Sequence, residues 1–303
     1  METVCIFNPE HDLCLANGDR NFVPPQSALQ FADNCHGIMR IVHDAPSSSV
    51  NTLRNFLKDN FPDIRVIPWG WNATLKHSLL RLGFPEETLP DDGFIAWVRK
   101  TQHRTSLLPL LNESIAVSQT EDLKDYLDEH NDIVLKSPWS GSGRGIRRIC
   151  GTLGEKDLAW AKKTIREQCC VIAEPFRDIA LEFALEYNNG RFAGYSLFSS
   201  KNGVYRSNTL LYDDEIEELV NRHGSGLDLL KPSVEKWLHA NVFPHYDGPL
   251  GIDCHVDRGN KLHVSEMNLR HTMGLVAHAY LQRHPETHGK EFSADRWNGE
   301  RVV

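Results

Sequence analysis

The pattern of apolar and polar positions predicts alternating strands and helices over the first hundred residues. Residues 4–7 (VCIF) and 66–69 (VIPW) have the apolar runs of short strands, and residues 47–61 carry apolar side chains at helical spacing. A second helix is predicted over residues 73–82, with Gly83 as its C-terminal cap, because glycine readily adopts the left-handed conformation there. This part of the chain is therefore expected to form a small α/β unit.

The pattern changes in the rest of the chain, where predicted strands follow one another closely. Residues 132–136 (DIVLK) and 146–150 (IRRIC) are predicted strands on either side of a glycine-rich stretch. Residues 180–187 (ALEFALEY) alternate, which places their two glutamates on one face and large apolar side chains on the other. The Asn-Gly pair at 189–190 then signals a hairpin. A largely antiparallel α+β region is expected.

A further hairpin is predicted around Gly259-Asn260, since a two-residue type II′ turn prefers glycine first. Counting back from this turn places Asp253 opposite Glu266, with Asn268 on the same face as Glu266. Facing carboxylates are destabilising unless a cation lies between them, and Mg²⁺ prefers oxygen ligands of this kind. The three residues therefore form a candidate metal site; the alternative is a pair of acids that point into solvent.

The glycine-rich stretch at residues 140–145 (SGSGRG) follows the predicted strand that ends at Lys136. Glycines let backbone N–H groups approach an anion closely, and the flanking Lys and Arg side chains add positive charge. The stretch is thus a candidate phosphate loop, and a hairpin tip without chemistry is the alternative. It is not a Walker A sequence, because no Gly-Lys-Ser/Thr follows, and it lacks the Rossmann spacing.

Composition narrows the class of protein. The chain has 303 residues, enough for two or three subdomains, and its 33 basic and 41 acidic residues give a net charge of −8, which disfavours a general nucleic-acid-binding surface. No apolar run approaches the roughly 18 residues of a membrane span, and the N-terminal residues do not resemble a signal peptide, so a cytoplasmic protein without a membrane partner is expected. The seven cysteines contain no C-x-x-C pair and the 15 histidines no H-E-x-x-H motif, which disfavours a dedicated histidine metal site.

From about Lys100 to Met273, the order of these motifs resembles the ATP-grasp family. The resemblance implies an α/β plus α+β fold, the ATP-grasp fold, in which two α+β subdomains clasp ATP and a small α/β (pre-ATP-grasp) domain precedes them. The implied division is residues 1–97 for the N-terminal domain, 98–173 for the central subdomain with the glycine-rich loop, and 174–303 for the C-terminal subdomain with the metal site.

The resemblance also implies roles for individual residues. Lys100 and Lys136 match two lysines that neutralise phosphate charge, and Glu182 matches a ribose-binding side chain. The alternatives are a helix surface for Lys100, a strand end in solvent for Lys136 and the exposed face of an alternating strand for Glu182. Arg270 matches an arginine that contacts the reacting acyl or phosphoryl group, so catalytic roles are expected for Arg270 and Lys136; the alternative for Arg270 is a structural pair with an acid. The implied cofactors are ATP and Mg²⁺ (or Mn²⁺), the metal bound by Asp253, Glu266 and Asn268. The expected nucleotide-binding residues are Lys100, Lys136, Ser140, Gly141, Ser142, Gly143, Arg144, Gly145, Glu174, Pro175, Phe176 and Glu182.

The polar segment after the first predicted strand is a candidate substrate site. Asn8, Glu10, His11 and Asp12 lie at the strand end where open α/β sheets usually bind ligands. A capped turn is the alternative, since Asn, Pro, Glu and Asp are common turn residues.

The function implied by the resemblance is an ATP-dependent carboxylate–amine (or thiol) ligase that acts through an acylphosphate. Its partners would be a small carboxylate and an amine that the sequence does not identify. The alternatives are a small-molecule kinase of the same fold and a regulator that binds ATP without turnover. The regulator is disfavoured because all the expected acids and lysines, together with Arg270, are present. A protein kinase is disfavoured because the H-R-D and D-F-G motifs are missing.

Overall fold

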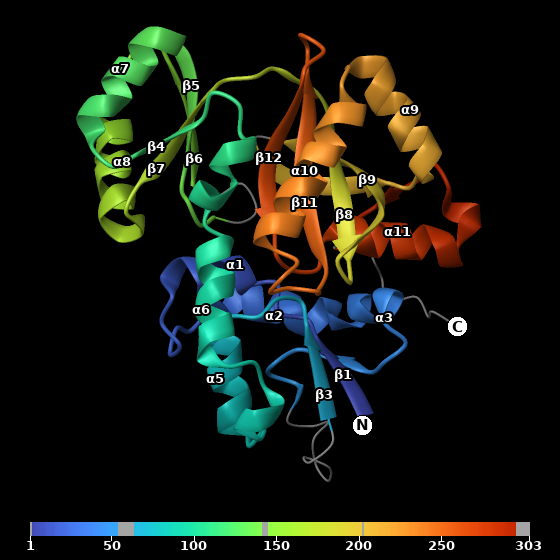
Figure 1. Cartoon of the computed structure of the whole chain (residues 1–303). Helices are drawn as coiled ribbons and strands as arrows, with labels where there is room; N and C mark the ends of the chain where they lie inside the picture. The colour runs from blue at the N-terminus through green and yellow to red at the C-terminus, as the bar shows by residue number, and fades with distance from the viewer. Residues whose placement is uncertain (1, 54–63, 141–144, 202, 295–303) are drawn as a thin grey trace.

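Three β-sheets form the framework of the protein in a computed structural model that describes residues 2–53, 64–140, 145–201 and 203–294. In Figure 1 the N-terminal sheet lies at the bottom, a four-stranded sheet at the upper left and a six-stranded sheet at the upper right. This is the α/β plus α+β class that the sequence predicts. No helix within the described ranges is both long and apolar enough to cross a membrane.

The N-terminal sheet is parallel, with strand order β2-β1-β3. The helix predicted over 73–82 is confirmed, and Gly83 ends it with a left-handed φ of 96°. Within the segment 47–61, Ser47 and Ser48 pair with β1 as a strand. A helical turn follows, in which the N–H of Thr52 donates to Ser49 Oγ and that of Leu53 to the Ser49 carbonyl, as expected for a serine cap. Residues 54–61 lie outside the described part of the chain. The elements are β1 Glu2–Ile6, α1 His11–Asn17, α2 Gln26–Cys35, η1 His36–Ile38, α3 Met39–Val42, β2 Ser47–Ser48, β3 Ile64–Pro68 and α5 Ala73–Leu82.

The four-stranded sheet is antiparallel, with strand order β4-β7-β5-β6. Leu123 of α7 and Ala161 of α8 pack with Ile133 and Leu135 of β5, so both helices cover one face. The elements from the N-terminal sheet onward are η2 Glu86–Thr88, α6 Asp92–Thr101, η3 Arg104–Leu110, β4 Ile115–Val117, α7 Thr120–His130, β5 Asp132–Lys136, β6 Ile146–Cys150, α8 Glu155–Gln168 and β7 Val171–Pro175.

The six-stranded sheet is also antiparallel, with strand order β12-β11-β8-β9-β10-β13. Helices α9 and α10 pack on the face that carries Phe183 and Leu185 of β8. The alternation predicted for β8 leaves its glutamates on the other face, away from these helices. The elements are β8 Ile179–Asn188, β9 Arg191–Lys201, β10 Val204–Thr209, α9 Asp213–His223, α10 Leu227–Asn241, β11 Leu250–Asp257, β12 Leu262–Asn268, α11 Met273–Arg283, η4 Pro285–Thr287 and β13 Glu291–Phe292.

The pairing of β11 with β12 places Asp253 opposite Glu266, as predicted, but the predicted turn is wrong. The N–H of Asp257 donates to the carbonyl of Lys261, so the loop contains three residues, 258–260, rather than two. Asn260 has a left-handed φ of 63°, as is common for the last residue of such loops. The longer loop alone would shift the pairing by one residue.

A β-bulge at Ser265 cancels this shift. On the turn side of the bulge His255 pairs with His263, and beyond it Asp253 pairs with Glu266. The extra residue lets both pairs face the same side of the sheet, where the rings of His255 and His263 stack with centroids 5.0 Å apart. The bulge therefore gathers polar side chains from both halves of β12 onto one face.

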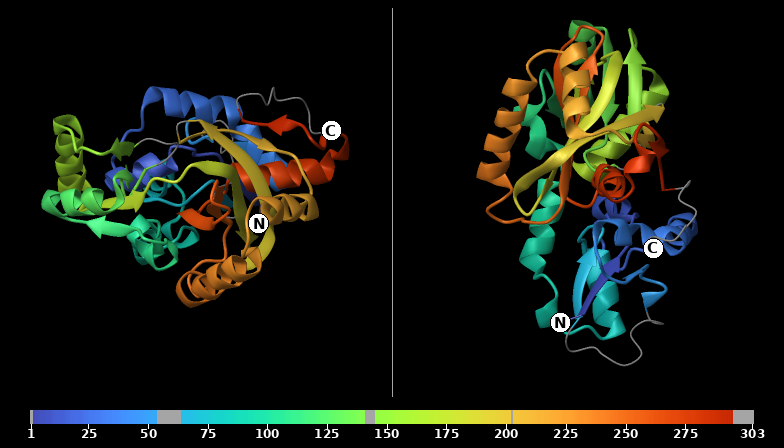
Figure 2. Two further views of the ribbon diagram at one scale, coloured as in Figure 1. Left: turned by 90° about the horizontal axis from the view of Figure 1, so that it is seen from above. Right: turned by 90° about the vertical axis from the view of Figure 1, so that its right-hand side faces the viewer.

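Helix α11 joins the six-stranded sheet to the N-terminal unit. The right-hand view of Figure 2 shows this helix, in red, between the strands of the sheet and the blue N-terminal helices. Val276 and Leu281 of α11 share a buried core with Phe7, Met39 and other apolar residues of the N-terminal unit. Helix α11 thus fixes the N-terminal unit against the six-stranded sheet.

The division into 1–97, 98–173 and 174–303 remains a prediction. Helix α6 continues through residue 97, and β7 continues through residue 173. Any boundary at those positions would cut a regular element.

Leu281→Ala should destabilise the protein by about 2–5 kcal/mol, because it would leave a cavity in the core beneath α11. Urea denaturation followed by circular dichroism measures this change. Leu229→Ala is the matched control, since Leu229 is 72% exposed, and it should change the free energy of unfolding by less than about 0.5 kcal/mol. Equal effects of the two substitutions would contradict the assignment of this core.

Candidate active site

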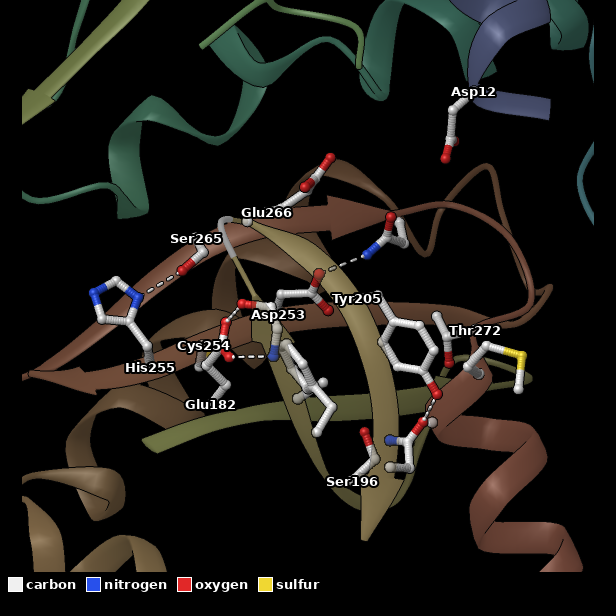
Figure 3. A pocket seen from close by; sticks show the side chains of 18 of the residues that line it. Asp12, Glu182, Ser196, Tyr205, Asp253, Cys254, His255, Ser265, Glu266 and Thr272 are labelled. Atoms are coloured by element: carbon white, nitrogen blue, oxygen red, sulfur yellow. Dashed lines mark hydrogen bonds between the residues drawn. The ribbon is translucent and has the colours of Figure 1, made fainter. Parts of the chain in front are cut away.

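A cavity of about 460 Å³ lies where the three sheets meet. Its walls include Lys136 of the four-stranded sheet, Glu182 and Asp253 of the six-stranded sheet, and Phe7 and Trp69 at the ends of N-terminal strands. Figure 3 shows the polar face of the large sheet, with Asp12 reaching toward it from the N-terminal helix α1. Seven of the residues predicted to bind nucleotide or metal therefore surround one space: Lys136, Glu174, Phe176, Glu182, Asp253, Glu266 and Asn268.

The carboxylates of β11 and β12 lie at the centre of the cavity wall (Figure 3). Arg104 Nη2 lies 2.7 Å from Glu266 Oε1, and Asn268 Nδ2 donates to Asp253 Oδ2 over 3.1 Å. Asp253 forms no ion pair within the described residues. Burial, together with the negative charges of Glu266 and Glu186, raises the pKa of Asp253 to about 8.

This donor set fits a divalent cation. Two carboxylates face each other, one of them without a cationic partner, and the Asn268 amide supplies another oxygen. Mg²⁺ favours such oxygen ligands, and its charge would lower the energy of ionised Asp253. In the described part of the chain no group of three His, Cys, Asp or Glu side chains forms a metal site, so the amide is needed to complete the set.

Lys136 and Glu174 form the opposite wall of the cavity. Lys136 Nζ lies 2.5 Å from Glu174 Oε1, and both side chains are largely buried. The neighbouring strands β5 and β7 bring them together, since Val134 pairs with Glu174. Lys136 therefore presents a positive charge across the cavity from the carboxylates.

The other residues predicted for the nucleotide have mixed positions. Glu182 lines the cavity and accepts hydrogen bonds from the backbone N–H and the hydroxyl of Ser200, at 2.8 and 2.7 Å. Phe176 also lines it, with the Arg148 guanidinium 3.4 Å above its ring centre. Pro175 ends β7 and does not line the cavity.

The ends of the glycine-rich stretch lie beside the cavity rather than in its wall. Ser140 Oγ accepts a hydrogen bond from Arg104 Nη1 over 2.7 Å, and the Gly145 carbonyl accepts one from the N–H of Ser137 over 2.8 Å. Gly145 has a left-handed φ of 76°, and a Cβ there would lie 2.7 Å from Ser137 Oγ, so no other residue fits well. Gly141, Ser142, Gly143 and Arg144 lie outside the described residues.

Arg270 lines the cavity and pairs with Asp12 of α1. Its Nε and Nη2 donate to the two carboxylate oxygens over 3.0 and 2.9 Å. The pair lowers the pKa of Asp12 against the effect of its burial, and raises that of Arg270. Of the four predicted substrate residues, Asp12 alone lines the cavity.

Asn8, Glu10 and His11 are buried and do not line the cavity. The Asn8 side chain both donates to the Gly70 carbonyl and accepts from its N–H, which ties the loops after β1 and β3 together. His11 Nδ1 lies 3.2 Å from the Asn72 amide nitrogen. For Asn8 and His11 the alternative of a structured turn fits better than substrate contact.

Lys100 requires a correction. It is exposed near the end of α6 and does not line the cavity. Arg104, in the same basic segment, is only 5% exposed and contacts Glu266, Ser137 and Ser140. The expected basic side chain is therefore one helical turn further along, in η3.

Two further cavity residues were not predicted as site residues. Glu186 is only 1% exposed and accepts hydrogen bonds from Ser196 and Thr272. The alternation of β8 is the signal that could have identified it, since it shares a face with Glu182. His255 also lines the cavity, and its Nδ1 lies 2.7 Å from Ser265 Oγ.

No protein-family model and no curated protein matches the chain, whereas solved structures do. D-cycloserine synthetase DcsG is similar with a TM-score of 0.52 and 14% identity, over 93% of this chain and 99% of that one. Biotin carboxylase from Campylobacter jejuni, in complex with β,γ-ATP, is similar with a TM-score of 0.53 and 12% identity, over 92% and 70%. The protein therefore has the ATP-grasp fold that the order of its motifs predicts.

Asp253 should make the ligand-free protein less stable as the pH rises. Its folded pKa is raised from 3.8 to about 8, so between these values the folded state binds more protons than the unfolded state. The free energy of unfolding of Asp253→Asn minus that of wild type should therefore grow with pH, by at most about 1.4 kcal/mol per unit. Urea denaturation from pH 5 to 8 measures it. A difference that stays constant over this range would exclude a raised pKa at Asp253.

Proposed function

We propose that the protein is an ATP-dependent carboxylate–amine (or thiol) ligase that forms ADP through an acylphosphate. The observation that carries the proposal is the single cavity in which facing Asp253 and Glu266 lie near Arg270 and across from Lys136. The cavity thus contains oxygen donors for a metal, a cation for phosphate and a cation for the reacting group.

Different residues of the cavity would contact different parts of the bound nucleotide and metal. Asp253, Glu266 and Asn268 would hold Mg²⁺ or Mn²⁺, which would supply positive charge to neutralise the phosphates. Lys136 and Arg104 would release their carboxylate partners and contact phosphates. Glu182 would accept hydrogen bonds from the ribose hydroxyls.

The chemistry follows from this placement. A substrate carboxylate attacks the γ-phosphorus, ADP leaves, and the acylphosphate carbon becomes open to an amine. Arg270 stabilises the oxyanion that forms as the amine adds, and Asp12 fixes the guanidinium in place. The adduct then breaks its bond to the phosphate oxygen, so that inorganic phosphate leaves and the amine nitrogen loses a proton to give the amide. The apolar side chains of Phe7 and Trp69 limit water near the intermediate. D-cycloserine synthetase and biotin carboxylase, which share the fold, support this class of activity.

The test is ADP release by the purified protein with ATP, Mg²⁺ and pools of amino acids, peptides and small carboxylates. Hydroxylamine should trap the acylphosphate as a hydroxamate. Glu266→Gln should lower both signals by roughly 100-fold or more, because it removes a metal ligand.

Glu129→Gln, an exposed glutamate of α7, is the matched control and should behave as wild type. A phosphorylated hydroxyl product without hydroxamate would favour a kinase of this fold. Binding of ATP without turnover in any pool would favour the regulator, and equal turnover by Glu266→Gln would show that the activity belongs to a contaminant.

The placement of Arg104 yields a separate prediction. Arg104→Gln should reduce ATP-dependent turnover by roughly 100-fold, because a buried cation beside Glu266 and Ser140 is lost. Lys100→Gln should change it by less than about twofold. Steady-state kinetics in ATP measures both, with thermal melting to check folding, and a larger loss for Lys100→Gln would restore the role first predicted for that lysine.

A further inference from the structure

Glu186 is a buried carboxyl group that faces the cavity without a cationic partner. It is 1% exposed, and no Lys, Arg or His side chain forms an ion pair with it within the described residues. Burial raises its pKa to about 7. A buried carboxyl group that lacks a cation is costly to the fold, and such groups are common at binding sites.

The surroundings of Glu186 form a built site. Ser196 Oγ of β9 donates to Oε1 over 2.8 Å, and Thr272 Oγ1, at the start of α11, donates to Oε2 over 2.7 Å. A Cβ at Gly274 would lie 1.9 Å from Oε1, so glycine is needed there to leave room for the carboxyl group. Strand β9 and the start of α11 thus hold this side chain in one orientation.

Glu186 lies at the end of the cavity away from the predicted ribose contact. Along β8 it follows Glu182 and Ala184 on one face, and Ala184 pairs with Asp253. The charge of Glu186 acts on Asp253, and the charges of His278 and Arg270 act on Glu186. It is therefore close to the position where an acylphosphate would react, on the side opposite the nucleoside.

An aromatic wall continues from this end of the cavity. His271 donates its N–H to the Trp69 carbonyl over 2.8 Å and stacks on the Trp69 ring, while the next residue, Thr272, binds Glu186. Phe7 packs edge-on against Trp69, with centroids 5.1 Å apart, and Phe31 lies against Phe7. Phe7, Phe31 and Trp69, here called the aromatic wall, all line the cavity, as does Met273.

We propose that Glu186 and the aromatic wall bind the acceptor substrate, and that this substrate is a primary amine carrying an aromatic group. The ammonium or amine nitrogen binds the Glu186 carboxylate, and the ring packs against Phe7, Phe31 and Trp69. That this amine is the acceptor of a ligase reaction rests on the proposed function. The binding of the amine at this site does not depend on turnover.

Calorimetric titration with tryptamine and 2-phenylethylamine tests the site, with Mg²⁺ and a non-hydrolysable ATP analogue present. Both amines should bind wild type, and Glu186→Gln should weaken binding at least tenfold because a neutral amide cannot pair with ammonium. Glutamine keeps the shape and can still bond the two hydroxyls, so the melting temperature should change little. Glu129→Gln, an exposed control, should bind both amines as wild type does.

Two comparison probes separate the charge from the ring. Indole-3-acetate has the tryptamine ring with the opposite charge, and ethylamine has the charge without a ring; both should bind at least tenfold more weakly than tryptamine. Phe31→Ala, at a partly exposed position, should weaken tryptamine binding but leave ethylamine binding unchanged, and it serves even where Glu186→Gln does not fold.

The proposal is overturned when neither aromatic amine binds wild type, when Glu186→Gln binds them equally well, or when indole-3-acetate binds as tightly as tryptamine. Failure of the ligase function is a different result. In that case the aromatic amines still bind through Glu186, but no carboxylate gives hydroxamate.

Discussion

The structure depends most on how it balances two acidic side chains that face each other across β11 and β12. Asp253 and Glu266 are held together by strand pairing, so their repulsion cannot be relieved by simple separation. Glu266 is balanced by Arg104, which comes from the connection between two other sheets. Among the described residues, Asp253 has only the Asn268 amide as a hydrogen-bond partner, and burial raises its pKa to about 8.

Ion pairs between buried or partly buried side chains also surround the cavity between the three sheets. Arg104–Glu266 joins η3 to the large sheet, and Arg270–Asp12 joins the large sheet to α1. Lys136–Glu174 links β5 and β7 of the four-stranded sheet at the cavity wall. Each pair places a cation next to the space in which the proposed function puts phosphates or a reacting oxyanion. Anionic ligands would compete for these cations, so binding and the arrangement of the sheets are expected to be coupled.

The face of β8 that lines the cavity carries, in order along one strand, the residues proposed for the different ligands. Glu182 is proposed for the ribose, Ala184 lies opposite the proposed metal ligand Asp253, and Glu186 is proposed for the amine. Strand β8 lies between β11 and β9 and is hydrogen-bonded to both, so the sheet fixes these positions relative to one another. The spacing of two residues along the strand, about 6.6 Å, would thus set the distance between successive parts of the bound ligands.

The sequence by itself determined the strands, the alternation of β8 and the order of motifs, because these depend on side chains that are close along the chain. It also placed Asp253 opposite Glu266, although only because a three-residue loop and the bulge at Ser265 shift the pairing in opposite directions. Only the tertiary structure decided that Arg104 rather than Lys100 faces the cavity, and that Glu186 binds Thr272 and lines the same cavity as the aromatic wall. Those contacts join distant segments, and their distances follow from how helices and sheets pack, which local periodicity does not encode.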